Sequence, residues 1–505
     1  MLNDLSPHRK EKVINIEKSN IQFPDQLMPV ETALDSLIDP KNKILLAAGI
    51  DPTNADQPEA NLFHAIFGRD ALIQLRIINS ARDFIKNSST ELLKQKMLLD
   101  LTETLNETTI LYLASLQGTK INVFSEEEIG KIAHEIRNSD DKIAIELNQE
   151  RGWEWPYYGS IDATIEYTMA IITEYKINSD FLKQEYISKD GIKRNIEHSL
   201  LEAIKCILKW GKNGLIEYKR MNSKGIEIQS WRDSFDAISS YIGGDLPDFN
   251  KPVALLDLQV LAFNVLSEIL LTESLFDSEQ LEQLEQLQIL KPDIKKLLNN
   301  LEKNIFEHFW IETPEGGYFA QAIQWSSDKD ELKEEPKIFD AISSSNLVML
   351  NSHLLKNKSD YQTKIFSTVY DKLQTQHGIR TLSSDSNRFH NCGYHTGNIW
   401  LFDTALCAFG LYETGYTEEA KSLFQSVINI CHETRMYPEL VGGDGYNTES
   451  VIVYDEVDKC ENKIKQPGQT IQGWSVSAYW LAQNALIGIK KSTTINLQCV
   501  GLKLC

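Results

Sequence analysis

Hydrophobic residues recur along most of this chain at the spacing of one helical face. Apolar side chains three or four residues apart line up on one side of an α-helix, whereas strict alternation marks a strand. Alternation is scarce here, and its best examples are residues 450–454 and 493–505. The helical spacing recurs in long runs at residues 71–87, 92–116, 161–176, 192–210, 253–272, 280–307, 361–375, 417–431 and 474–488. The pattern predicts an all-α protein with little β structure.

Six of the predicted helices begin in a stretch that is polar or glycine-bearing and often rich in aromatic residues. These stretches are residues 67–72, 157–164, 252–259, 342–349, 394–405 and 471–478. The gaps of roughly 50 to 95 residues leave room for the rest of each helix, a plainer amphipathic partner and a loop. Six such pairs predict an (α/α)6 toroid, in which six inner helices line a pocket and six outer helices wrap them. We expect an N-terminal arm at 1–45, the barrel at 46–490 and a C-terminal tail at 491–505.

The amino-acid composition restricts the kinds of ligand and the cellular location that we expect. The formal net charge of −21 argues against nucleic acid, because phosphate binding needs a basic face, and it favours a neutral ligand such as a sugar. An acidic surface without a role in binding is the alternative. The seven cysteines show no CxxC pair, which is typical of a reduced, cytoplasmic protein. The sequence has no apolar signal segment and no run of about eighteen apolar residues, so we expect neither secretion nor a membrane span.

Two acidic residues far apart in the sequence are the candidates for chemistry. Asp233 lies among aromatic residues in the segment 228–238, and Glu439 lies in the segment 435–440. In a ring of six inner helices these segments precede the third and the sixth, which stand opposite each other. Two carboxyl groups facing one pocket can hydrolyse a glycosidic bond, one as acid for the leaving oxygen and one as base for water. Opposite walls predict the separation of roughly 6.5–9.5 Å that inverting enzymes use.

Both residues also have structural interpretations. Asp233 could cap a helix, since aspartate before a helical run is a common N-cap. Glu439 follows Pro438 in a loop where a surface glutamate would be ordinary, and Asp444 is then a second candidate for the base. The sequence pattern alone leaves these alternatives open.

Nine stretches, in this order, resemble the (α/α)6 catalytic domain of bacterial glycogen-debranching, amylo-α-1,6-glucosidase-like glycosidases. More distantly they resemble the six-hairpin clan, which includes glucoamylases, trehalases and mannosyl- or glucosylglycerate hydrolases. The nine stretches run collinearly from about residue 62 to residue 480, at residues 67–72, 130–137, 157–164, 214–220, 229–238, 378–382, 394–416, 437–440 and 472–475.

The resemblance implies roles for single residues. Asp233 falls at the position of the general acid and Glu439 at that of the probable base, and no metal or cofactor is implied. Arg69 and Asp70 match a pair that grips the terminal sugar, which implies exo-action and is the preferred interpretation. The alternative is an ion pair that fixes a helix start. Asp236 is expected to be a structural or sugar-binding partner. The remaining matches to pocket-lining positions are Tyr158, Trp231, His395, Trp400, Asp403, Gln472 and Trp474.

The sequence departs from this family in ways that affect the substrate. No counterpart of the family's usual N-terminal β-sandwich precedes the helical region, and several pocket-lining stretches differ, including TIQGW at residues 470–474. We therefore expect an inverting, exo-acting glycoside hydrolase that releases an α-linked glucosyl unit from an oligosaccharide or a small glucoside. The alternatives are a glucosylglycerate- or trehalose-type glycosidase, a glycoside phosphorylase and a carbohydrate-binding protein without activity.

Overall fold

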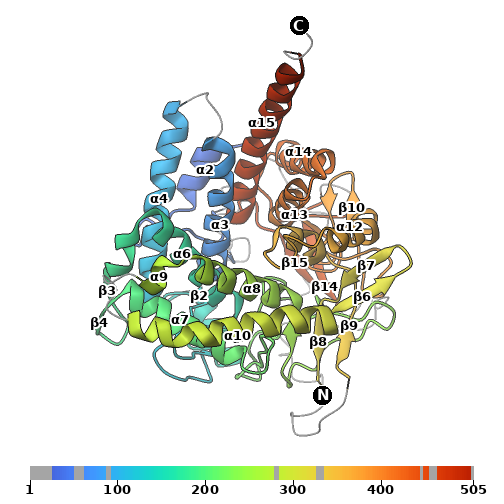
Figure 1. The fold of residues 1–505 in the computed structure, drawn as a ribbon. Coiled ribbons are helices and arrows are strands. Elements are labelled where there is room, and N and C mark those ends of the chain that lie inside the picture. Colours follow the sequence, from blue (N-terminus) through green and yellow to red (C-terminus); the bar gives the residue numbers. More distant parts are fainter. Residues whose placement is uncertain are drawn as a thin grey trace.

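The structure is a computed structural model that describes residues 26–50, 62–86, 92–277, 284–325, 335–443, 447–453 and 463–501. An inner ring is formed by α3 (Gly68–Lys86), α6 (Asp162–Ile177), α8 (Leu256–Leu271), the short pair α11 (Ser345–Val348) and η3 (Met349–Asn351), α13 (Leu401–Glu413) and α15 (Gly473–Gly501). Along the ring, α3 packs on α6, α6 on α8, α11 and η3 on α13, α13 on α15, and α15 on α3 (Figure 1). Between α8 and the segment after η3, the backbone N–H of His353 donates to the side chain of Asn264 at 2.9 Å. The fold is the predicted (α/α)6 toroid.

The outer layer fills the spaces between successive inner helices. Its helices are α4 (Leu92–Ser115), α7 (Ile196–Trp210), α10 (Leu284–His308), α12 (Ser359–Leu373) and α14 (Thr417–Thr434). The short helix α2 (Val30–Ser36) packs on α15, and its Leu34 is buried in the barrel core. The final part of the predicted N-terminal arm is therefore built into the barrel.

Burial separates the two layers as their sequences predict. Helix α13 has buried residues on nearly every side, which suits an inner helix enclosed by both neighbours and partners. Helix α14 buries one stripe and leaves the other face to solvent, as an outer amphipathic helix should. No helix in the described part of the chain is long and apolar enough to cross a membrane.

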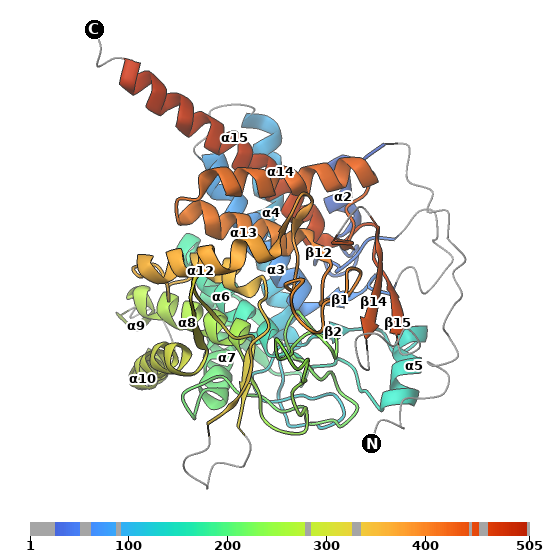
Figure 2. The ribbon, with the colours of Figure 1, turned by 90° about the vertical axis from the view of Figure 1, so that its right-hand side faces the viewer.

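Helix α5 (Lys142–Arg151) and many of the short strands gather at the end of the barrel where the inner helices begin, whereas α9 (Ser274–Asp277) lies at the opposite end, after α8 (Figure 2). The strands are β1 (Ile66–Phe67), β2 (Glu135–Ile136), β3 (Glu185–Ile187), β4 (Lys193–Asn195), β5 (Ala254–Leu255), β6 (Trp310–Thr313), β7 (Gly316–Phe319), β8 (Ala322–Gln324), β9 (Lys337–Phe339), β10 (Gln374–Thr375), β11 (Gly378–Ile379), β12 (Ile399–Trp400), β13 (Leu440–Val441), β14 (Glu449–Val453) and β15 (Lys463–Pro467). The structure also contains the short helix η2 (Ser179–Lys183).

The two predicted strands have different outcomes. The strand predicted at 450–454 is confirmed by β14, which pairs antiparallel with β15. The strand predicted from residue 493 is wrong, because α15 continues to Gly501. Extending an existing helix adds a hydrogen bond per residue without a new nucleation step, which outweighs a few residues of weak alternation.

Pairs of two- and three-residue strands tie the loops that enter the inner helices. β1 pairs with β2 ahead of α3, and β5 pairs with β8 ahead of α8. β12 pairs with β13 ahead of α13, with Trp400 opposite Leu440. This last pairing fixes the backbone next to Glu439 against the start of α13. The loops that carry the candidate residues are thereby held over one end of the barrel.

Candidate active site

Asp233 lies in an irregular loop between α7 and α8, where Arg69 of α3 binds it. The guanidinium donates from Nη2 to Asp233 Oδ2 at 2.8 Å and from Nη1 to the Ser230 carbonyl at 2.9 Å. Its Nε lies 3.5 Å from Asp70 Oδ2. Arg69 and Asp70 are buried, whereas the Asp233 side chain keeps 25% of its surface exposed. Arg69 therefore fastens the Asp233 loop to the first turn of α3, and Asp233 is open to a ligand.

Glu439 lies immediately before β13 and is buried. Tyr394 Oη donates to its Oε1 at 2.5 Å, and the Gln469 backbone N–H donates to its Oε2 at 3.0 Å. Burial raises the pKa of Glu439 to about 8, the two donors lower it, and the charges of Asp70 and Asp233 raise it further. Because these charges act on Glu439, the loops entering α8 and α15 bring their carboxyl groups into electrostatic reach of each other.

Further buried carboxyl groups surround Arg69. Burial raises the pKa of Asp70 to about 6, with Arg69 lowering it and Asp233 raising it. Burial likewise raises the pKa of Asp162 to about 7, with Arg69 opposing and Glu166 adding to the rise. Groups that titrate near neutrality can accept or donate hydrogen bonds. Such a cluster suits the hydroxyls of a neutral sugar.

Four predicted pocket residues form one aromatic cluster. The ring of Trp400 lies 4.9 Å from His395 in a stacked arrangement and 5.6 Å from Trp231 at an edge. Trp474 lies 5.5 Å from Trp400 and stacks on Phe402. Trp400 and Trp474 are buried, whereas Trp231 is half-buried. Among these three tryptophans, Trp231 has the free surface that stacking on a sugar face requires.

His395 is fixed by the residue that follows Asp233. Its Nδ1 lies 2.8 Å from Ser234 Oγ, and Ser234 Oγ donates to Asp236 Oδ1 at 2.8 Å. Burial, with the charges of Arg232 and Arg69, holds the pKa of His395 well below its usual value, so the ring is neutral. Its Nε2 has no hydrogen-bond partner among the described residues. Asp236 thus supports the loop through Ser234, and His395 keeps one ring nitrogen available.

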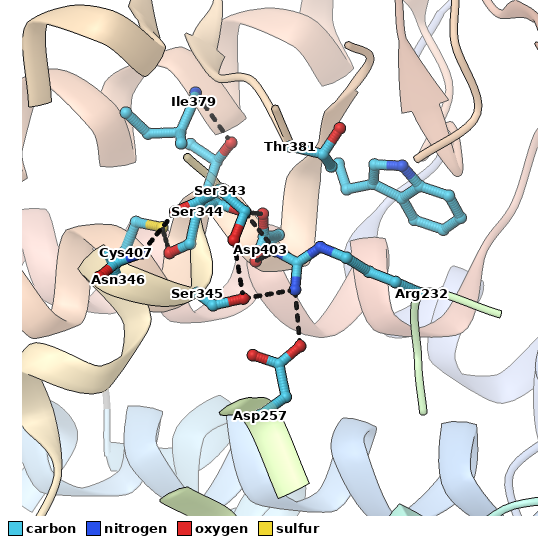
Figure 3. Close-up of polar contacts among 12 residues, drawn as sticks. Arg232, Asp257, Ser343, Ser344, Ser345, Asn346, Ile379, Thr381, Asp403 and Cys407 are labelled. Carbon is cyan, nitrogen blue, oxygen red and sulfur yellow. Dashed lines mark hydrogen bonds and ion pairs between the residues drawn. The ribbon is translucent and has the colours of Figure 1, made fainter. Parts of the chain in front are cut away.

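Asp403 lies deeper in the barrel, beside Arg232 (Figure 3). Ser344 Oγ donates to Asp403 Oδ2, and Arg232 Nη2 lies 3.8 Å from Asp403 Oδ1. Burial raises the pKa of Asp403 to about 6, and Arg232 and Ser344 oppose the rise. Asp403 and Arg232, with Trp231 and Asp257, line a cavity of about 100 Å³ between the inner helices. Through Arg232, the contacts of Asp403 therefore support the Asp233 loop from inside the barrel.

The structure separates Tyr158 from the other predicted pocket residues. Its buried hydroxyl donates to the Leu116 carbonyl at 2.5 Å and accepts from Lys189 Nζ at 2.9 Å. None of the described contacts of that hydroxyl is with Arg69 or the Asp233 loop. The pocket-lining position implied for Tyr158 therefore finds no support in its contacts, which belong to the outer layer.

Gln472 and Trp474 keep polar atoms without described partners. Gln472 donates its backbone N–H to the Tyr437 carbonyl at 2.9 Å, while its Oε1 has no hydrogen-bond partner among the described residues. The same holds for Trp474 Nε1. Buried polar atoms are usually paired, so both are candidates to bind a polar ligand. Asp444, the second candidate for the base, lies outside the described residues.

Some residues of the site were not predicted, although the sequence carries a signal for several. Asp162 and Asp257 occupy the first turns of α6 and α8, as Asp70 and Asp403 do in α3 and α13. Aspartate repeated at the start of successive inner helices is favoured by the helix dipole and could have been read as a motif. The roles of Tyr394 and Gln469 had no such signal, because they depend on long-range contacts. No group of three or more His, Cys, Asp or Glu within the described ranges is arranged to hold a metal ion.

Comparisons with known proteins bear on the fold and on one segment of the chain. Residues 344–439, from the start of α11 to Glu439, match the mannosylglycerate hydrolase MGH1-like glycoside hydrolase domain. A search of curated proteins finds no significant match.

Among solved structures, a glycosidase is 9% identical with a TM-score of 0.53, covering 91% of this chain and 95% of that one. A variant glycosidase in complex with glucose is 10% identical with a TM-score of 0.50 and the same coverage. The mannosylglycerate hydrolase from Thermus thermophilus is 10% identical with a TM-score of 0.49, covering 90% of this chain and 99% of that one.

The fold is shared with a solved glycosidase, and the matched domain, which ends at Glu439, is a glycoside hydrolase domain. The protein is therefore a glycoside hydrolase with an (α/α)6 barrel, and its substrate class is a carbohydrate.

Proposed function

We propose that the protein is an inverting, exo-acting hydrolase of a small α-hexoside, with glucosyl as the first candidate for the released unit. The observation that supports the proposal is that the charge of Asp233 acts on Glu439, although the two residues lie in loops that enter opposite inner helices. Asp233 is held by Arg69 and partly exposed, and Glu439 is buried within reach of its charge. Two carboxyl groups that approach a sugar from opposite sides suit inversion, in which the acid and the attacking water act on opposite faces of the ring.

In this mechanism Asp233 donates its proton to the glycosidic oxygen as the bond to the anomeric carbon breaks. Glu439 takes a proton from the water that attacks that carbon from the other face. Two observations support Glu439 as the base: Tyr394 and Gln469 both donate to its oxygens, which is the arrangement a carboxylate needs. The raised pKa of Glu439, about 8, favours the opposite assignment, because a carboxyl group with such a pKa is mostly protonated at neutral pH.

Burial supports exo-action. Glu439, Asp70 and Asp162 are each at most 4% exposed, so the region around the base is enclosed. An enclosed region accommodates a terminal sugar unit more readily than the middle of a chain. Arg69 and Asp70, in the first turn of α3, would bind the hydroxyls of that unit beside Asp233.

The matched domain favours a small aglycone over a polymer. Its name refers to mannosylglycerate, a hexose joined to a three-carbon acid. We therefore place glycerate-type α-hexosides first, with trehalose-type sugars and α-1,6-linked glucosyl branch points after them. A phosphorylase would replace water by phosphate and would not need the base, so the buried Glu439 with its two donors supports hydrolysis.

The first experiment is a panel of α-glycosides: glucosylglycerate, mannosylglycerate, trehalose and isomaltose, each with and without phosphate. We expect free hexose from at least one of them without added phosphate, with the β-anomer appearing first in proton NMR spectra. With the two glycerate glycosides, whose aglycone is not a sugar, initial release of the α-anomer would exclude inversion. Release of a sugar phosphate would indicate a phosphorylase. Absence of product from all four would favour a carbohydrate-binding role.

Substitution assigns the two carboxyl groups. We expect Asp233→Asn to lower kcat on the natural glycoside by on the order of 10²–10⁴-fold, because protonation of the leaving group is lost. The same variant should keep much more activity on the hexosyl fluoride, whose leaving group needs no proton, whereas Glu439→Gln should lose both. The reverse pattern would exchange the roles of Asp233 and Glu439.

A further inference from the structure

Arg232, the residue immediately before Asp233, joins the Asp233 loop to three inner helices (Figure 3). Its Nη1 donates to Asp257 Oδ2 in α8 and to Ser345 Oγ in α11, both at 2.7 Å. Its Nη2 donates to Ser344 Oγ at 2.5 Å and lies 3.8 Å from Asp403 Oδ1 in α13. One side chain thus meets three separate walls of the barrel.

The geometry of this contact depends on a guanidinium. Arg232 is 1% exposed, and its two terminal nitrogens point to different acceptors in the way that a planar fork allows. Removing a cation from water is costly unless it is paired and hydrogen-bonded, and Asp257 and Asp403 supply that pairing. A lysine in its place offers a single charged atom, which cannot serve both the acceptors of Nη1 in α8 and α11 and the acceptors of Nη2 at Ser344 and Asp403.

A second anchor holds the other end of the same loop. Gln229 donates from Nε2 to Glu126 and accepts at Oε1 from Lys131 Nζ at 3.4 Å, and its backbone N–H donates to Tyr218 Oη at 3.0 Å. Gln229 is four residues from Asp233, whereas Arg232 is its direct neighbour. Arg69 binds the Asp233 carboxyl group itself, and of the two further anchors Arg232 has the shorter path to that group.

We propose that Arg232 is a positioning residue for Asp233: by binding α8, α11 and α13 together, it sets where the carboxyl group stands relative to the glycosidic oxygen. The inference rests on the proposed function, since it assigns Arg232 to the placement of the acid. A shift of about 1 Å in a catalytic group can cost on the order of 10²-fold in rate. Arg232 acts through Asp233 and does not touch the sugar.

The test compares two leaving groups in the variant Arg232→Lys. We expect kcat on the natural glycoside to fall by on the order of 10–100-fold, with a much smaller loss on the hexosyl fluoride, because only the first reaction needs the proton of Asp233. KM for the two substrates should change less than kcat. A merely structural role would lower both rates equally, so an equal loss would overturn the proposal.

Hydrogen exchange supplies a readout that does not need activity. Amide exchange in residues 229–236 should rise in Arg232→Lys while the inner helices keep their protection. Ser345→Ala, which removes one acceptor of Arg232 and leaves the others, should show the same leaving-group pattern more weakly and provides a test if Arg232→Lys does not fold. Arg194→Lys, in the β3–β4 hairpin where Arg194 pairs with Asp190, is the matched control and should keep wild-type kinetics.

The outcomes separate this inference from the function on which it rests. Unchanged exchange together with wild-type rates in Arg232→Lys would overturn the positioning role while hydrolysis stands. If the wild-type protein cleaves neither glycoside nor fluoride, but exchange rises in the variant, the proposed function fails and the anchoring of the loop by Arg232 remains supported.

Discussion

Glu439 is subject to two opposing requirements if it is the base of the proposed mechanism. It needs to be enclosed so that a sugar can meet it without bulk water, yet enclosure disfavours its charged form. Its two hydrogen-bond donors, from Tyr394 and Gln469, only partly offset burial and the nearby charges of Asp70 and Asp233. The protein should therefore lose stability over the pH range in which the Glu439 carboxyl group ionises.

Replacing Glu439 by Gln should therefore stabilise the protein at alkaline pH while abolishing hydrolysis. The pKa of Glu439 is about 8 in the folded protein against an ordinary 4.5, so its contribution to stability is full below 4.5 and is lost as pH rises through 8. Glutamine has no such loss, and its advantage should grow between pH 5 and pH 8.5, reaching on the order of 1–3 kcal/mol. The measurement is the difference in melting temperature between variant and wild type at each pH.

Glu268 provides a control of opposite sign. Its pKa is lowered to about 2, chiefly by the hydrogen bond with His353 and then by Lys176, so its charged form stabilises the protein above 4.5. Glu268→Gln should lower the melting temperature at neutral pH, where Glu439→Gln raises it. If the difference in melting temperature between Glu439→Gln and the wild type stays constant with pH, the pKa of Glu439 is not raised.

At the scale of elements, the contact between α11 and α13 depends on a glycine. A Cβ added to Gly410 of α13 would lie 2.5 Å from the Leu347 carbonyl oxygen of α11. Because that neighbour is backbone, relief requires the whole short helix α11 to move. Ser345, which holds Arg232, lies in this helix, so the closeness of the two helices also bears on the Asp233 loop.

Gly410→Ala should therefore destabilise the protein by about 1–3 kcal/mol, as overpacking does. In an exposed helix interior the same change would stabilise by up to about 1 kcal/mol, so the sign is diagnostic. Gly488→Ala in α15 is the control, since its Cβ would lie 3.0 Å from the movable ring of Phe84 and the variant should be near neutral. Unfolding in urea distinguishes them, and equal stability of the two variants would show that α11 yields without cost.

At the scale of the whole molecule, acidic residues outnumber basic ones, and several acidic residues are buried. The net charge is −21, and the pKa values of several buried carboxyl groups lie well above their ordinary values. Two buried histidines, His134 and His395, change the stability in the opposite direction with pH. Burial holds the pKa of each well below 6.5, so the stability that their neutral forms contribute is lost as pH falls below 6.5. The raised pKa values reach about 6 for Asp70 and Asp403, about 7 for Asp162 and about 8 for Glu439.

We expect the melting temperature to fall between pH 6 and pH 8.5. Each raised carboxyl group stabilises the fold below its ordinary pKa, and this contribution disappears as pH rises through the value in the folded protein. Salt screens repulsion among surface charges but reaches buried groups poorly, so most of the decrease should persist at about 0.5 M salt. A melting temperature that rises across this interval, or a decrease that salt removes, would show that buried carboxyl groups are not the cause.

The periodic spacing of apolar residues determined which segments are helices. The run at 161–176 became α6 (Asp162–Ile177), and the run at 361–375 became α12 (Ser359–Leu373). Helical periodicity is local, since each residue contacts others three and four positions away, so a single sequence records it. The tail after residue 493 failed because its weak alternation competed with continuation of α15.

For the site, too, some features could be predicted from the sequence and others only from the structure. The sequence by itself marked Asp233, Glu439 and Arg69 as unusual residues in short motifs, and the order of the helices placed the two acids in opposite loops. Only the tertiary structure decided that Arg69 binds Asp233, that Tyr394 binds Glu439, and that Tyr158 turns to Leu116 and Lys189. Such contacts join residues tens to hundreds of positions apart, and closure of the ring, which no local pattern encodes, brings them together.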